Sequence, residues 1–285
     1  MAFRARAIRT TVVGAVALAV VIAAPIVYRQ NTATAAAQPA AAAVAPAAVA
    51  PAVVVPVQAA AVTAPGRLLD RLATTPKKTT ITLLGDSTGN EQKEWFYQLS
   101  TWISARNPSY RATYRLWNST KQAYGPSVLL RAGTGGPELV FYNGSVPSTR
   151  ADYATDTKRF AKMTAQGGDL YLVSYSHNEN AATTYPAYAT LVNRLAAKPT
   201  RPVVLPVLQN PEGAPGKTSL QRYAHVKRLG IIEKLAKDKG WSTVDAYRAF
   251  TADKRALKTL VPDGVHPNAA GQAVWLSAAQ KAFLR

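Results

Sequence analysis

From residue 79 onward, the chain alternates short apolar runs with stretches whose apolar residues recur at helical spacing. The apolar runs are residues 81–84, 138–142, 170–174, 203–208 and 242–245. Between them, apolar residues three and four positions apart mark helical faces, for example within residues 95–103, 188–195 and 229–236. Consecutive parallel strands need a crossover, which is usually a helix. The alternation therefore predicts an α/β domain with a parallel sheet covered by helices.

Residues 110–131 break this alternation. Residues 113–117 and 127–131 have the composition of strands, and no helical stretch lies between them. We therefore expect a β-hairpin inserted before the second parallel strand. Three glycines and a proline in residues 133–137 predict a turn into that strand. A phosphate-binding loop is not expected here, because the cluster lacks the Lys and Ser/Thr of a P-loop and precedes a strand.

The first 66 residues have a composition that cannot specify a packed core. They contain no Asp or Glu and four basic residues, Arg4, Arg6, Arg9 and Arg29. Residues 11–28 are uncharged, and their length of 18 lies between that of a signal-peptide core and that of a membrane-spanning helix. Small residues at 33–35 favour cleavage, whereas Arg29 and the length of the run favour a retained anchor. In both cases residues 1–30 predict export, with the C-terminal part outside the cytoplasm.

Residues 31–66 predict a disordered linker. They are rich in alanine, and five prolines interrupt any long helix and favour extended, polyproline-like segments. We expect this linker to hold a folded domain away from a membrane. Residues 67–285 are long enough for one domain with an ample apolar core.

Charge and cysteine content restrict the partners of this domain. Only four of the 34 Lys and Arg residues, and none of the 15 Asp and Glu residues, precede residue 67, so residues 67–285 carry a formal charge of +15. This excess favours anionic surroundings, such as cell-envelope polymers or phospholipid head groups, with solubility as the alternative role. Nucleic acid is not expected, because the basic residues are scattered and no nucleic-acid motif is present. The absence of cysteine excludes disulfides and cysteine-bound zinc.

Polar residues follow the predicted strands where these end, which is where a doubly wound sheet forms its functional crevice. They are Gly85-Asp86-Ser87, residues 143–148, residues 176–179 and Gln209-Asn210, while Asp263 and His266 precede the last amphipathic helix. A serine hydroxyl is a poor nucleophile at neutral pH. It needs an imidazole to accept its proton and a third group to orient that imidazole. Ser87, His266 and Asp263 are residues of these three types.

These motifs resemble, in the same order, the four sequence blocks of the SGNH (GDSL-type) serine hydrolase family. Gly85-Asp86-Ser87 matches the first block, residues 143–148 the second (Asn-x-x-x-x-Gly), residues 176–179 the third (Gly-His-Asn-Glu), and Asp263 with His266 the last (Asp-x-x-His). The resemblance covers roughly residues 75–285. It implies a three-layer, flavodoxin-like parallel sheet flanked by helices, with the hairpin as an insertion. The chain departs from the family pattern at Ser148 and Ser176, where glycine is usual.

The resemblance also implies roles. Ser87 would be the nucleophile, His266 the general base, and Asp263 the residue that orients the imidazole. The oxyanion hole would consist of the N–H of Ser87, the N–H of Ser148 and the side-chain amide of Asn178. A serine at position 148 still offers its N–H where its φ and ψ are tolerated. We also expect a helix to begin just after Ser87, with its positive end near the oxyanion.

Each residue has a simpler structural interpretation as well. The Asp86-Ser87 pair could cap the following helix, and Asp263 could belong to a turn. We interpret Asp86 as a residue that organises its loop. We expect His177 to be structural or to line a pocket, and His225 to be solvated on a basic helix face. Taken jointly and in one order, the motifs favour catalysis.

The sequence thus predicts an exported serine esterase, without a cofactor, that hydrolyses or transfers an acyl group through an acyl-serine intermediate. Its expected substrate is an acyl ester of a cell-envelope carbohydrate or lipid, and an uncleaved N-terminal segment would bind a membrane. The alternative is a non-catalytic module of the same fold that binds anionic polymers, motivated by the two missing glycines. A metal-dependent hydrolase is not expected, because no two of the three histidines lie at ligand spacing.

Overall fold

The structure, a computed structural model, describes residues 65–284, apart from the side chains of residues 181–185. The predicted signal peptide or anchor and almost all of the predicted linker lie outside these residues. The described chain begins with α1 (Pro65–Thr74), so this helix includes the last two residues that we assigned to the linker. Proline suits the start of a helix, where its missing N–H would have no partner. Within residues 65–284, no helix has both the length and the apolarity that crossing a bilayer requires.

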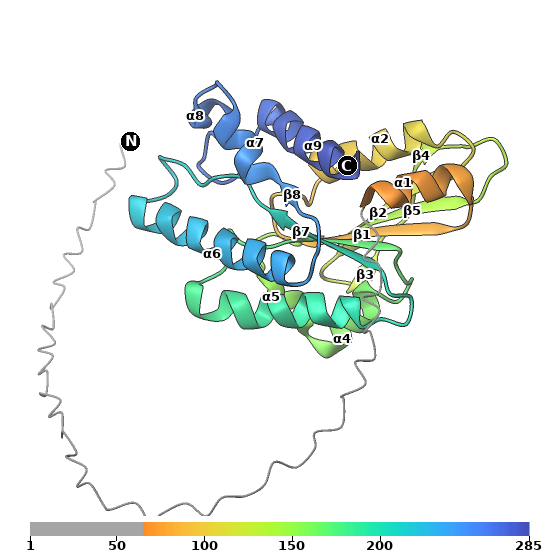
Figure 1. Ribbon diagram of the computed structural model, residues 1–285, viewed down its shortest axis with the longest axis horizontal. Helices are drawn as coiled ribbons and strands as arrows, with labels where there is room; N and C mark the ends of the chain where they lie inside the picture. The colour runs from red at the N-terminus through yellow and green to blue at the C-terminus, as the bar shows by residue number, and fades with distance from the viewer. Residues whose placement is uncertain (1–64, 285) are drawn as a thin grey trace, which may run out of the picture. The chain divides into compact units, whose positions relative to one another are not determined.

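An eight-stranded sheet forms the centre of the domain (Figure 1). Its strands are β1 (Thr79–Gly85), β2 (Arg111–Asn118), β3 (Ala123–Tyr124), β4 (Val128–Arg131), β5 (Glu138–Asn143), β6 (Leu170–Ser174), β7 (Val203–Leu208) and β8 (Val244–Asp245). The series β5-β1-β6-β7-β8 is parallel and has the flavodoxin-like order. β1 lies at the switch point of this order, where the loops that follow neighbouring strands diverge and leave a crevice.

The five predicted parallel strands are present, and the predicted hairpin joins the main sheet. β2 and β4 are antiparallel, with Tyr114 opposite Val128. β2 also pairs in parallel with β5, which places Tyr114 beside Phe141. The hairpin therefore precedes the second parallel strand in the chain, as predicted, and its first strand extends the parallel sheet beyond β5.

Helices cover both faces of the sheet, which gives the three predicted layers. They are α2 (Trp95–Arg106), α3 (Ala151–Thr155), α4 (Thr157–Met163), α5 (Ala181–Ala196), α6 (Ser219–Asp238), α7 (Ala246–Ala252), α8 (Leu257–Leu260) and α9 (Ala269–Phe283). Figure 1 shows α1, α2, α7 and α9 on one face and α4, α5 and α6 on the other. The predicted helical faces lie on α2, α5 and α6.

Each face of the sheet has its own buried core. On one face, the rings of Trp95 in α2 and Trp275 in α9 stack with their centroids 5.3 Å apart. Successive residues of β1 point to opposite faces, so Leu83 packs in this core and Leu84 in the other. All seven residues of β1 are buried, as is typical of a central parallel strand. This packing fixes the end of β1 from which Ser87 follows.

Candidate active site

Ser87, His266 and Asp263 form a hydrogen-bonded chain at the carboxyl end of the sheet. The Oγ of Ser87 lies 2.8 Å from Nε2 of His266. The Nδ1 of His266 lies 2.6 Å from Oδ2 of Asp263. When Nδ1–H donates to the carboxylate, Nε2 is free to accept the proton of the serine hydroxyl. The structure thus brings these three residues together in the arrangement that an activated serine requires.

The Asp263 carboxylate is held by its own loop. Its Oδ1 accepts hydrogen bonds from the backbone N–H groups of Val265, at 2.8 Å, and His266, at 2.7 Å. Partial burial raises the pKa of Asp263, but the hydrogen bond from the His266 ring and these two backbone bonds outweigh it, so the net pKa is lowered. Asp263 is therefore ionised at neutral pH and can balance the charge of a protonated His266.

Gly264 makes the turn that directs this loop back toward β1. Its φ is +83°, in the left-handed region that glycine adopts without strain. Its carbonyl accepts a hydrogen bond from the N–H of Gly213 at 2.9 Å. Directly after the loop, the side chain of Asn268 caps α9 by accepting bonds from two backbone N–H groups of the first turn. The loop of His266 is therefore anchored at both ends.

Ser87 follows β1 in a turn that Asp86 organises. Asp86 is buried, and its Oδ1 accepts hydrogen bonds from the N–H of Thr88 at 3.1 Å and from its hydroxyl at 2.7 Å. This agrees with the interpretation of Asp86 as a loop-organising residue. The side-chain amide of Gln209, which follows β7, lies 3.1 Å from both carboxylate oxygens of Asp86. Gln209 therefore supports the Ser87 turn from a strand two places away in the sheet.

The expectation of a helix beginning just after Ser87 is wrong. Residues 87–94 contain turns and bends, and α2 begins at Trp95. The carbonyl of Gly89 accepts a hydrogen bond from the side chain of Asn143 at 2.6 Å, so the segment is held by the end of β5 rather than by a helical turn. Stabilisation of an oxyanion here depends on individual donors, because no helix begins beside Ser87.

The other two predicted oxyanion donors lie on neighbouring loops. Ser148 has a φ of +60°, so a serine adopts the left-handed conformation at a position where the family pattern has glycine. Asn178 donates through Nδ2 to the carbonyl of Thr149 at 3.1 Å. Glu179 accepts a bond from the N–H of Ala151 at 2.6 Å. These two bonds tie the loop after β6 to the loop after β5.

Ser148 and Asn178 border an open depression of about 680 Å³ whose wall is polar. The guanidinium of Arg159 lies 4.2 Å from the centre of the Tyr153 ring, and its Nε donates to the Tyr153 carbonyl at 2.9 Å. The depression is lined by Ser148, Thr149, Arg150, Asp152, Tyr153, Arg159 and Asn178. The side chain of His266 is 46% exposed. The catalytic groups are therefore open to a bulky substrate.

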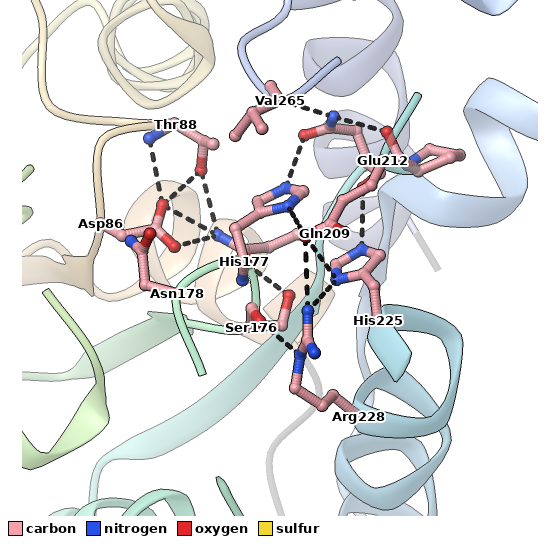
Figure 2. A network of polar contacts seen from close by, with 12 residues as sticks. Asp86, Thr88, Ser176, His177, Asn178, Gln209, Glu212, His225, Arg228 and Val265 are labelled. Atoms are coloured by element: carbon pink, nitrogen blue, oxygen red, sulfur yellow. Dashed lines mark hydrogen bonds and ion pairs between the residues drawn. The ribbon is translucent and has the colours of Figure 1, made fainter. Parts of the chain in front are cut away.

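Ser176, the second departure from the family pattern, is fully buried and has a partner for its hydroxyl. Its Oγ donates to Oε1 of Gln209. The N–H of His177 donates to the same oxygen at 3.1 Å. Because the amide nitrogen of Gln209 contacts Asp86, this one side chain connects the loop after β1 with the loop after β6 (Figure 2).

A buried polar cluster of His177, Glu212, His225 and Arg228 lies beside the loop of Asn178 (Figure 2). Nδ1 of His177 and the guanidinium of Arg228 each lie 3.3 Å from Oε1 of Glu212. His177 is buried, in agreement with a structural role. The prediction that His225 is solvated is wrong, because α6 turns it inward and its ring stacks on His177 with the centroids 4.5 Å apart. His225 and Arg228 lie three residues apart on α6 and therefore on the same face of the helix. This spacing was the sequence signal that the two side chains could be buried together.

Burial keeps His225 neutral. It lowers the pKa of His225 well below the ordinary value for histidine, and the neighbouring His177 and Arg228 lower it further. The Nε2 of His225 lies 3.0 Å from the carbonyl of Asn210 and donates its proton there. The cluster is therefore a fixed part of the fold, with its positive charge provided by Arg228.

His177, Glu212 and His225 each offer one possible metal ligand, and these atoms lie within 4.8 Å of one another. Sequence spacing did not indicate this proximity. The geometry does not suit an ion, however, because the two ring planes are within 8° of parallel. An ion in the plane of one ring then lies outside the plane of the other, away from its lone pair. Arg228 also already places a positive charge beside Glu212, so we assign the cluster a structural role.

Residues 84–274 match the model of the GDSL-like lipase/acylhydrolase family. The chain belongs to this family. The match includes the Asp86-Ser87 turn and the loop of Asp263 and His266. The family groups this GDSL-like protein with lipases and acylhydrolases.

Solved structures share the GDSL-like fold at low sequence identity. A two-domain esterase active on acetylated mannans aligns with a TM-score of 0.55 and 17% identity, over 76% of this chain and 51% of its own. LAE5, an α/β hydrolase from the metagenome of Lake Arreo, Spain, aligns with a TM-score of 0.55 and 15% identity, over 73% of this chain and 96% of its own.

An acetyl xylan esterase variant from Geobacillus stearothermophilus aligns with a TM-score of 0.53 and 14% identity, over 72% of this chain and 94% of its own. The GDSL-like chain thus spans about half the length of the two-domain esterase. No curated protein sequence shows significant similarity to it. At these identities, the solved structures establish the fold.

Proposed function

We propose that this GDSL-like protein is an exported esterase that hydrolyses an acyl ester of a cell-envelope carbohydrate through an acyl-serine intermediate. The observation that carries the proposal is the hydrogen-bonded chain from Ser87 through His266 to Asp263, with distances of 2.8 and 2.6 Å. A module that only binds polymers does not need an activated serine. The hydrogen bonds that join Ser87, His266 and Asp263 therefore favour an enzyme over the binding module.

In the first half of the proposed reaction, Ser87 becomes acylated. Its Oγ attacks the ester carbonyl carbon while Nε2 of His266 accepts the hydroxyl proton, and Asp263 stabilises the resulting imidazolium. The negative charge on the carbonyl oxygen is stabilised by the N–H groups of Ser87 and Ser148 and by the amide of Asn178. The bond to the alcohol then breaks, and His266 gives its proton to the departing alcohol.

In the second half, water releases the acyl group. His266 accepts a proton from water as the water oxygen attacks the acyl carbon. The bond to Ser87 Oγ then breaks, the proton of His266 returns to that oxygen, and the carboxylic acid departs. The steps need no cofactor. When an alcohol enters in place of water, the same steps transfer the acyl group to it.

The open and polar setting supports a carbohydrate ester over a lipid ester. The side chains of His266 and Asp263 are 46% and 54% exposed, and the depression beside the oxyanion donors is lined mainly by polar and charged groups. Among the proteins of similar fold, one is active on acetylated mannans and another is an acetyl xylan esterase. We extend this preference to the present chain and propose a short acyl group, such as acetyl, on a polysaccharide.

Export and contact with envelope polymers are the parts of the proposal that rest on the sequence. Residues 1–30 have the features of a signal peptide or anchor, and an uncleaved segment keeps the protein at a membrane. The charge of +15 on residues 67–285 favours association with anionic polymers.

Activity measurements on acetylated mannan and xylan oligosaccharides, phospholipids and aryl esters of different chain length test the proposal. Ser87→Ala should reduce turnover by about six orders of magnitude, because the nucleophile is lost. Ser127→Ala, in an exposed loop, is the matched control and should keep full activity. Equal turnover of aryl acetates by Ser87→Ala and the unaltered protein would rule out the mechanism. A higher kcat/KM for phospholipids than for acetylated oligosaccharides would contradict the proposed substrate class.

A further inference from the structure

Asn210, which follows β7, connects two loops of the active site through its side chain. It is fully buried. Its Nδ2 donates to the carbonyl of Val265 at 3.0 Å, and its Oδ1 lies 3.2 Å from Nε2 of His177. Figure 2 shows Val265 and His177 in the same network of contacts. They belong to different loops, because Val265 precedes α9 and His177 follows β6. One amide group therefore spans the loop of His266 and the loop of Asn178.

Both partners of Asn210 directly precede a residue of the proposed mechanism. Val265 is followed by His266, and His177 is followed by Asn178. The carbonyl of Val265 belongs to the rigid peptide plane that continues into His266, so fixing that oxygen restricts the position of the imidazole. The ring of His177 restricts the backbone from which the Asn178 amide extends.

We propose that Asn210 is a positioning residue that sets the separation between the base, His266, and the oxyanion donor, Asn178. The inference rests on the proposed function, because His266 and Asn178 are base and oxyanion donor only in that mechanism. It goes beyond the proposed function because residue 210 belongs to none of the four family blocks and is assigned no contact with substrate.

The surrounding cluster makes Asn210 a rigid connection. Its own backbone carbonyl accepts the proton of His225 Nε2 at 3.0 Å. On the other side, Arg228 donates through Nε to the carbonyl of Ser176 at 2.7 Å, and thereby holds the residue that precedes His177. Because these groups are buried, their hydrogen bonds have no competition from water. A displacement of the Asn210 side chain is therefore transmitted to both loops.

The expected consequence is a loss of turnover with substrate binding preserved. A misplacement of about 1 Å between reacting groups can reduce a rate about a hundredfold. The depression that borders Ser148 does not include Asn210. Asn210→Ala should therefore lower kcat for an aryl acetate by roughly 10- to 100-fold and change KM by less than about twofold.

The matched control is Val207→Ala, which removes a buried apolar side chain from β7 and leaves the hydrogen bonds of Asn210 to Val265 and His177 in place. It should lower thermal stability as Asn210→Ala does, yet keep kcat within about twofold. A second comparison uses Asn178→Ala, in which the oxyanion amide is already absent. If Asn210 acts through Asn178, then Asn210→Ala should reduce kcat by a smaller factor in the Asn178→Ala variant than in the unaltered protein.

A readout independent of turnover is the NMR signal of the ring proton shared by His266 and Asp263, assigned by its loss in His266→Gln. Asn210→Ala should shift or broaden this signal, whereas Val207→Ala should leave it in place. Asn210→Ser, which shortens the side chain and removes its amide group, provides the same test if Asn210→Ala does not fold. An unchanged signal together with a kcat within twofold of normal, in folded protein, would overturn the inference. Failure of the esterase proposal itself would appear instead as an absence of turnover that leaves the shift of the NMR signal intact.

Discussion

At the scale of single residues, the two serines that replace family glycines have different physical consequences. Ser176 uses its hydroxyl inside the fold, as a donor to Gln209. Ser148 instead adopts a φ of +60°, which costs an L-residue with a Cβ roughly 1–2 kcal/mol. Ser148 is compatible with the mechanism because the second sequence block is expected to contribute a backbone N–H rather than a side chain. Ser176 is compatible with it because its buried hydroxyl has a partner within the fold.

Ser148→Gly tests this view of position 148. Glycine relieves the left-handed strain but increases the entropy of the unfolded chain, so the free energy of unfolding should change by no more than about 1 kcal/mol. kcat should be retained, since the N–H remains. Ser148→Val, with a branched Cβ, should instead destabilise the protein by roughly 1–2 kcal/mol. Urea unfolding and aryl acetate turnover measure both effects, and a large loss of kcat in Ser148→Gly would contradict the assigned role.

Glu94 predicts a pH dependence of stability. Burial raises its pKa to about 7, against the lowering effect of the hydrogen bond from the N–H of Glu91. The folded protein therefore holds this proton more tightly than the unfolded chain does. The associated stability is fully present below about pH 4.5 and is lost as the pH rises through 7.

Glu94→Gln should remove this dependence. The neutral amide can still accept the hydrogen bond from the N–H of Glu91. At pH 8.5 the variant should therefore have a higher Tm than the unaltered protein, and its free energy of unfolding should be larger by on the order of 1–3 kcal/mol. The two proteins should have similar Tm values at pH 4. Thermal unfolding across this range checks the prediction, and parallel Tm curves would show that Glu94 does not titrate as stated.

At the scale of secondary structure, strands were predictable because their signal is local. The runs at residues 81–84 and 203–208 are continuous and apolar, and the structure buries them as β1 and β7. The helix expected after Ser87 was not realised, because a bond between Asn143 and Gly89 joins residues 54 positions apart. Pairing of β2 with β5 likewise depends on a distant partner. Local sequence patterns do not predict contacts between residues that are distant in the chain.

The candidate site follows the same division. Ser87, Asp263 and His266 could be identified from the sequence because they belong to ordered motifs. In the sequence, Gln209 and Asn210 could be identified only as polar residues at the end of a strand. The hydrogen-bond partners of Gln209 include His177 and Asp86, which lie 32 and 123 positions away in the chain. Their connecting role needed the structure.

α6 provides a test of the buried cluster. Arg228 is 7% exposed at its side chain and faces Glu212, whereas Lys234 on the same helix is 75% exposed and pairs with Asp238. Arg228→Ala should cost about 3–5 kcal/mol, because it leaves the Glu212 carboxylate buried without its cation. Lys234→Ala should cost less than about 1 kcal/mol. Comparable losses in chemical denaturation would show that the cluster does not behave as a buried ion pair.

At the scale of the whole molecule, the parallel sheet explains how motifs from distant parts of the chain meet. Strands β1, β5, β6 and β7 are neighbours, and their carboxyl ends place the four polar loops along one edge. α9 packs against α2, so the loop of His266 returns to the strand that precedes Ser87. The active site is therefore a consequence of strand order.

The most direct test of the account is to map the covalent adduct formed with a fluorophosphonate probe, by intact-mass measurement and peptide analysis. We expect one adduct on Ser87, absent in Ser87→Ala and formed far more slowly in His266→Gln. Folded protein that remains unlabelled, or that is labelled at another residue, would contradict it.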